Sequence, residues 1–103
     1  MLKPCCTKES AESKAIDDVA GFVRAINEPN RLRILCLLKQ GELCVCDIFE
    51  TLALPQNLAS HHLKELKEAG LVQSRKEGTK VLYSRNESTI KHLTRGLTNI
   101  TNI

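Results

Sequence analysis

The 103-residue sequence contains no tryptophan, one tyrosine and two phenylalanines. Proteins that bind single-stranded nucleic acid usually stack bases on aromatic side chains, so this scarcity argues against that function. No apolar run approaches the ~20 residues of a membrane-spanning helix, and no apolar signal core follows the N-terminus, so we expect a cytoplasmic protein. Neither GxGxxG nor GxxxxGK[ST] occurs in the sequence, which argues against a nucleotide-dependent enzyme.

The composition that is present is typical of one small globular domain, with 42% hydrophobic and 26% charged residues. The net charge is +3, and its position is more informative than its size. Residues 55–85 contain three acidic side chains and six basic ones, namely Lys64, Lys67, Arg75, Lys76, Lys80 and Arg85. A local basic excess indicates a polyanionic partner, although a solvated surface explains the charges equally well.

Hydrophobic periodicity predicts a mainly α-helical fold with one β-hairpin. Residues 1–13 show no periodicity, so we expect a flexible N-terminal arm, with a folded domain over residues 14–101. Helical spacing covers residues 14–27, the segment between Pro29 and Gly41, and residues 45–53, 56–69 and 86–101. The second of these helices is apolar on most sides, so we expect it to be central and Cys36 to be a small core residue. Residues 72–76 and 80–84 are candidate strands around a turn at Gly78.

A short helix, a break at Pro55 and a second helix with a polar outer face form a helix-turn-helix, and the basic hairpin after it forms a wing. Short polar side chains on such a helix read base edges in the major groove of duplex DNA, while basic hairpin residues contact phosphate. The alternative is a solvated helix face, and we assign His62 to packing. The predicted DNA contacts are Gln56, Asn57, Ser60, His61, Lys64, Arg75, Lys76 and Lys80.

An apolar seam lies on the last predicted helix, formed by Ile90, Leu93, Leu97 and Ile100. Such a seam packs against the first helix or against a second copy of the chain. One recognition helix gives limited affinity, so we expect a homodimer on a palindromic DNA site.

Five cysteines without an export signal indicate reduced thiols, with metal binding or redox sensing as their roles. Cys5 and Cys6 are adjacent, and Cys44 and Cys46 are one residue apart, so neither pair is well placed for an ordinary disulfide. Thiols at positions i and i+2 point ~200° apart in a regular helix, so Cys44 and Cys46 need a non-helical entry turn to share one ion. Up to four thiolates favour a soft ion: As(III) or Sb(III) for three, Cd(II) or Zn(II) for four, and Pb(II) for either.

The runs ELCVCDI and ASHHLKELKEAGLVQSRKEGTKVLYS resemble the ArsR/SmtB family of metal-sensing winged helix-turn-helix repressors. The resemblance spans residues 16–97. It implies a homodimer of ααααββα topology that binds operator DNA without any cofactor and releases it on metal binding. By the same resemblance, Cys44 and Cys46 match the thiol ligands of the family's third helix, Cys5 and Cys6 resemble ligands from the N-terminal arm, and Ser60 and His61 match the recognition-helix signature.

Two departures from the family pattern bear on the ion. Arsenic sensors of the family carry a third cysteine where Phe49 stands here, and cadmium and lead sensors space their arm cysteines more widely than Cys5 and Cys6. An adjacent arm pair resembles another arsenite-sensing branch, so As(III) or Sb(III) is favoured over Cd(II), Pb(II) or Zn(II). Only His92 remains of the family's zinc site on the last helix, so we expect that site to be absent.

Three functions remain in competition. The first is a metal(loid)-responsive repressor, and the second is a repressor on the same scaffold that senses oxidants through its thiols. The third is a small thiol enzyme or metal carrier without DNA affinity. No histidine or acidic residue is spaced so as to activate a cysteine nucleophile, so we expect the chain not to be an enzyme.

Overall fold

The computed structural model describes residues 11–102 of the chain, which form five α-helices, one short 3₁₀-helix and three strands. In chain order these are α1 (Ala11–Ile26), α2 (Pro29–Leu37), the 3₁₀-helix η1 (Leu38–Gln40), β1 (Leu43–Cys44), α3 (Val45–Thr51), α4 (Gln56–Glu68), β2 (Val72–Glu77), β3 (Lys80–Arg85) and α5 (Glu87–Thr101). The mainly helical winged helix-turn-helix fold expected from the sequence is confirmed.

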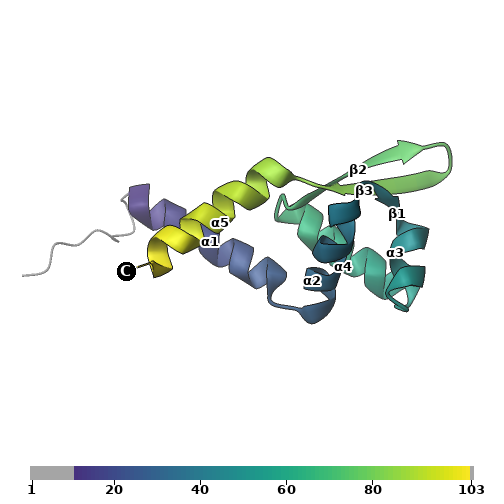
Figure 1. The fold of residues 1–103 in the computed structure, drawn as a ribbon, viewed down its shortest axis with the longest axis horizontal. Helices are drawn as coiled ribbons and strands as arrows, with labels where there is room; N and C mark the ends of the chain where they lie inside the picture. The colour runs from purple at the N-terminus through teal and green to yellow at the C-terminus, as the bar shows by residue number, and fades with distance from the viewer. Residues whose placement is uncertain (1–10, 103) are drawn as a thin grey trace, which may run out of the picture.

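The elements are arranged in two parts (Figure 1). Helices α1 and α5 pack side by side and form the helical layer. Helices α3 and α4 and strands β2 and β3 form the head, with the hairpin extending from one edge. One hydrophobic core extends from the head to α1 and α5, through Phe22 and Leu93. Its largest fully buried side chains are Ile34, Ile48, Leu63, Leu66 and Leu71.

Local signals in the sequence explain where the helices begin. Pro29 occupies the first turn of α2, and the Glu28 side chain accepts from the Arg31 backbone N–H, so it caps that helix. Helix α5 is capped in the same manner by Asn86, whose side chain accepts from the Thr89 N–H at 3.3 Å. Helix starts were therefore predictable to within a few residues.

The three strands form one antiparallel sheet in the order β1-β3-β2. Glu77 pairs with Lys80, and Gly78 adopts φ +63° in the turn between them, a conformation that glycine accepts without strain. Strand β1 was not predicted, because two residues are too few to show alternation. Its Cys44 pairs with Leu82 and attaches the start of α3 to the middle of strand β3.

Three details differ from the sequence-based expectations. Residues 11–13, which we assigned to the arm, form the start of helix α1. Cys36 is an exposed free cysteine and not a core residue. Helix α2 is only partly central, because Ile34 and Leu35 are buried while Leu32 remains 49% exposed. Among residues 11–102, no helix has the length and apolar character that a membrane crossing requires.

Candidate nucleic-acid interface and thiol site

Helix α4 has one buried and one exposed face. Its buried face consists of Ala59, His62, Leu63 and Leu66, which pack against the core. The opposite face consists of side chains that are all exposed: Gln56, Asn57, Ser60, His61 and Lys64. These are the five helix residues that we predicted to contact DNA. The structure places them on one solvent-facing stripe, and their contact with DNA stays a prediction.

The three hairpin residues that we predicted to contact DNA differ in whether a carboxylate already pairs with them. Lys76 and Lys80 are exposed. Arg75 instead donates from Nε and Nη2 to the two carboxylate oxygens of Glu42, at 2.8 and 2.7 Å, and its Nη2 also lies 2.9 Å from Glu77 Oε2. The hydrogen bond from Arg75 lowers the pKa of Glu42, and the two carboxylates raise the pKa of Arg75. The positive charge of Arg75 is therefore paired with two carboxylates, which its place in a basic run did not suggest.

The thiol pair lies where β1 meets the start of α3. Cys44 is the N-cap of α3, with extended φ −77° and ψ 158°, and its Sγ accepts from the Asp47 N–H at 3.2 Å. The Cα atoms of Cys44 and Cys46 are 5.3 Å apart, and the two residues form a disulfide. Our expectation that this pair is poorly placed for a disulfide was wrong. Side chains two residues apart diverge only within a regular helix. Cys44 precedes α3 and lies in the non-helical entry turn that we expected a shared ion to require.

The donor atoms around this turn are close together. The sulfurs of Cys44 and Cys46 and a carboxylate oxygen of Asp47 all lie within 4.8 Å of one another. Cys44 is 4% exposed and Cys46 is half-buried, so the pair is partly shielded from water. In the reduced state, thiolates so placed suit a soft ion. The other two predicted ligands, Cys5 and Cys6, lie outside the described residues.

The thiol pair and the exposed face of α4 share one hollow. This pocket of about 380 Å³ is lined by Cys44 and Cys46 together with Gln56 and Ser60 of α4 and Lys80 of the hairpin. These residues come from β1, α3, α4 and β3 and lie up to 36 residues apart in the sequence (from 44 to 80), so only the fold brings them together. A group held by the two sulfurs therefore lies within reach of three of the predicted DNA contacts.

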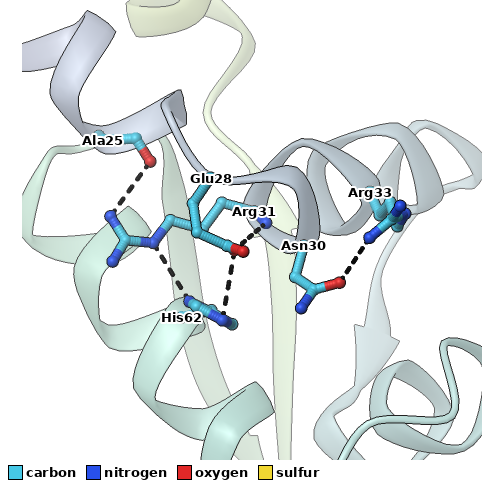
Figure 2. A network of polar contacts seen from close by, with 6 residues as sticks. All are labelled: Ala25, Glu28, Asn30, Arg31, Arg33 and His62. Atoms are coloured by element: carbon cyan, nitrogen blue, oxygen red, sulfur yellow. Dashed lines mark hydrogen bonds and ion pairs between the residues drawn. The ribbon is translucent and has the colours of Figure 1, made fainter.

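Behind α4, the buried His62 has polar partners that packing alone did not predict (Figure 2). Arg31 Nε donates to His62 Nδ1 at 3.2 Å, and His62 Nε2 lies 3.3 Å from Glu28 Oε2. Burial lowers the pKa of His62, against the opposing effect of Glu28. Burial alone raises the pKa of Glu28, but hydrogen bonds from the backbone N–H groups of Asn30 and Arg31 outweigh it, and the net pKa is lowered.

The predicted apolar seam on α5 is partly used within the chain. Leu93 is buried, and Ile90 and Leu97 pack against the core with part of their surface left exposed. Ile100 is 50% exposed. His92 is exposed, as expected from the sequence.

The chain is similar in sequence to known bacterial transcriptional regulators. Residues 28–74 match the family model described as "Bacterial regulatory protein, arsR family". The chain is 36% identical over 80 residues to an arsenical resistance operon repressor of Staphylococcus xylosus, which covers 78% of this chain and 77% of that protein. It is also 40% identical over 77 residues to a homolog of the cadmium resistance transcriptional regulatory protein CadC from Staphylococcus aureus, covering 74% and 64% of the two chains.

Among solved structures, a homodimeric winged helix-turn-helix DNA-binding domain from Mycobacterium bovis is similar to this chain, with a TM-score of 0.73 and 28% identity. The alignment covers 100% of this chain and 94% of that one. The similarity therefore extends over the helical layer and the head together.

Proposed function

The chain belongs to the ArsR family of metal-responsive transcriptional repressors, and from that premise we propose that it binds operator DNA as a metal-free homodimer and releases it when its thiolates capture a soft ion. Members of this family are DNA-binding regulators and not enzymes. The observation that carries the proposal is the hollow shared by Cys44, Cys46 and the polar face of α4.

DNA reading is assigned to the exposed face of α4 and to the hairpin. Asn57 and Gln56 offer amides that pair with adenine, and Ser60 and His61 reach base edges or phosphate. Lys64, Lys76 and Lys80 supply positive charge to the phosphates, and Arg75 joins them only when Glu42 and Glu77 release it. The remaining apolar surface of α5, centred on Ile100, supports pairing with a second copy, which would place two α4 helices on a palindromic operator.

Ion capture is assigned to the reduced thiols of Cys44 and Cys46, completed by Cys5 and Cys6 from the same or the partner chain. The N-terminus of α3 and the Asp47 N–H both stabilise negative charge on Cys44 Sγ, which favours the thiolate that binds a metal. Sulfur ligands without a histidine favour a soft ion. The adjacent pair Cys5 and Cys6 resembles an arsenite-sensing branch of the family, so As(III) or Sb(III) is slightly favoured over Cd(II), Pb(II) and Zn(II).

The proposed ion site lies close to the predicted DNA contacts. Because the sulfurs line the same hollow as Gln56, Ser60 and Lys80, an arm drawn to the thiols would occupy space that DNA needs. Strand β1 adds a second link, since Cys44 pairs with Leu82 in the middle of strand β3 of the hairpin. A coupling free energy of ~2–3 kcal/mol would give a ~30–150-fold loss of DNA affinity.

The decisive variant is Cys44→Ser combined with Cys46→Ser. We expect it to bind a duplex selected from a random library with near wild-type affinity but to lose its response to arsenite and cadmium in a mobility-shift titration. Cys36→Ser is the matched control, because Cys36 is exposed on α2 and is expected to leave the response intact. A double variant that still releases DNA on addition of the ion would remove the sensing role from this pair.

A second candidate function, thiol redox sensing, is favoured by the Cys44–Cys46 disulfide. Hydrogen peroxide would take one hydrogen from each thiol and become two molecules of water, leaving the disulfide behind. Under this hypothesis, peroxide releases DNA in the presence of a chelator, the protein mass falls by two hydrogens, and a dithiol reductant restores binding. Oxidised protein that holds DNA as tightly as the reduced form would exclude this function.

A further inference from the structure

Three helices meet at a polar network on the back of α4 (Figure 2). Arg31, in the first turn of α2, donates from Nε to His62 Nδ1 at 3.2 Å and from Nη1 to the Ala25 carbonyl at 3.4 Å, near the end of α1. Glu28 Oε2 accepts from the Arg31 backbone N–H at 3.0 Å and lies 3.3 Å from His62 Nε2. The network therefore joins the α1–α2 corner to the middle of α4.

The network defines the state of the His62 ring. Because Arg31 Nε–H can only donate, His62 Nδ1 must be bare to accept from it, and the proton of the neutral ring then sits on Nε2, facing Glu28. If Nδ1 were protonated, its N–H and the Arg31 Nε–H would face each other as two donors without an acceptor. The Arg31 contact therefore requires an uncharged imidazole.

The other contacts of α4 with the core are not directional. Its remaining buried side chains are Ala59, Leu63 and Leu66, which are apolar and tolerate small rotations or shifts along the helix axis. The hydrogen bond from Arg31 to one ring atom of His62 fixes the rotation of α4 and its position along the helix axis, because a hydrogen bond weakens steeply when its distance or angle changes.

We infer that His62 is a positioning residue for DNA binding, whose uncharged Nδ1 fixes the orientation of α4 through Arg31. The inference rests on the proposed function of α4 as the DNA-reading helix. His62 lies on the face opposite to the predicted base contacts and acts on DNA only through the placement of α4.

A pH dependence of definite sign follows. The charged or titratable groups that act on His62 are Glu28 and Arg31 from the α1–α2 corner and His61 and Glu65 from α4 itself. Burial and the charge of Arg31 outweigh the carboxylates and lower the pKa of His62 below its usual 6.5. The contribution of the Arg31–His62 hydrogen bond to DNA affinity is therefore complete above that pH and is lost as the pH falls through the lowered pKa.

The test compares His62→Asn with His62→Leu, two side chains of similar size. The Asn amide oxygen takes the position of Nδ1 and accepts from Arg31 without being protonated, whereas Leu fills the space but leaves the Arg31 donor without an acceptor. With a duplex selected by the reduced, metal-free protein, we expect Asn to retain wild-type affinity within about threefold and Leu to lose about tenfold. Circular dichroism and thermal unfolding confirm that both variants are folded.

The second readout is the pH profile of DNA affinity. As the pH falls from about 7.5 to about 5.5, the wild type is expected to lose affinity by less than about tenfold, because the pKa of His62 lies below 6.5, and His62→Asn is expected to stay flat. His92→Gln is the control and should behave like the wild type. Equal affinities for the Asn and Leu variants, or an acid loss that persists in His62→Asn, would overturn the inference. A wild type with no duplex affinity at any pH would instead overturn the proposed function on which the inference depends.

Discussion

The contacts within the helical layer differ in kind from those within the head. In the layer, α1 and α5 pack so closely that a Cβ added at Gly96 would lie 2.8 Å from Val19 Cγ2. The head contributes buried apolar side chains to the core, and directional contacts add to them: the cap of Cys44 on α3, the Glu42–Arg75 pair and the hydrogen bond from Arg31 of α2 to His62. Close packing fixes the arrangement of the layer, whereas the head also carries thiol, imidazole and carboxylate groups, which ions, protons or oxidants can change. The comparison indicates why an effector site belongs in the head.

The largest expected effect tests how firmly α3 is anchored to the core. Ile48→Ala removes a side chain with no exposed surface from α3 and should lower the free energy of unfolding by ~2–5 kcal/mol. Leu32→Ala, at a position that is 49% exposed on α2, is the control and should change it by less than ~0.5 kcal/mol. Denaturant titration measures both. A small effect of Ile48→Ala would mean that polar contacts alone hold α3 in place.

A second pair of variants probes the close packing of the layer. Gly96→Ala must separate α1 from α5 and should cost ~1–3 kcal/mol of unfolding free energy. Gly21→Ala meets only the end of the Arg24 side chain at 3.8 Å, so it should stabilise helix α1 by ~0.5–1 kcal/mol. If the two substitutions have the same sign in thermal unfolding, close packing does not distinguish the layer.

Lys80→Ala and Arg75→Ala compare a free and a paired cation within the hairpin. Lys80 should contact phosphate directly, so its loss should reduce the slope of log affinity against log salt by up to about 1. Arg75 is held by Glu42 and Glu77, so Arg75→Ala should change that slope less. Fluorescence anisotropy at several salt concentrations provides the comparison. A larger change for Arg75→Ala would show that DNA displaces both carboxylates.

The smallest expected effect is a pH dependence of stability at the exposed pair. The hydrogen bond from Arg75 lowers the pKa of Glu42 below its usual 4.5, so the contribution of the pair is present above that pH and is lost as the pH falls through the lowered value. Glu42→Gln should flatten this part of the stability curve measured by thermal unfolding. An unchanged acid limb in Glu42→Gln would exclude the pair as its source.

The order of elements was predictable because periodicity, caps and turn residues are local signals. The apolar spacing of α4 and the glycine of the hairpin each act within a few residues. The expected position of His62 was correct for the same reason: it falls on the apolar face of its own helix.

The polar contacts were not predictable because they join distant parts of the chain. Arg75 and Glu42 are separated by 33 residues, and Arg31 and His62 by 31. The disulfide was missed for a different reason. The short separation of Cys44 and Cys46 argued against a disulfide, but Cys44 has the extended backbone of an N-cap, and its Cα lies 5.3 Å from that of Cys46. The sequence suggested the thiol ligands, and only the fold shows that they share a hollow with Gln56 and Ser60.

The most direct measurement follows thiolate coordination and DNA release in one titration. Reduced protein bound to a labelled duplex is titrated with As(III), Cd(II), Pb(II) and Zn(II), while sulfur-to-metal charge-transfer absorbance and fluorescence anisotropy are recorded together. The account predicts that for at least one ion the absorbance rises as the anisotropy falls, with a ~30–150-fold weaker complex at saturation. Absorbance that saturates for every ion while the DNA stays bound with unchanged affinity would contradict it.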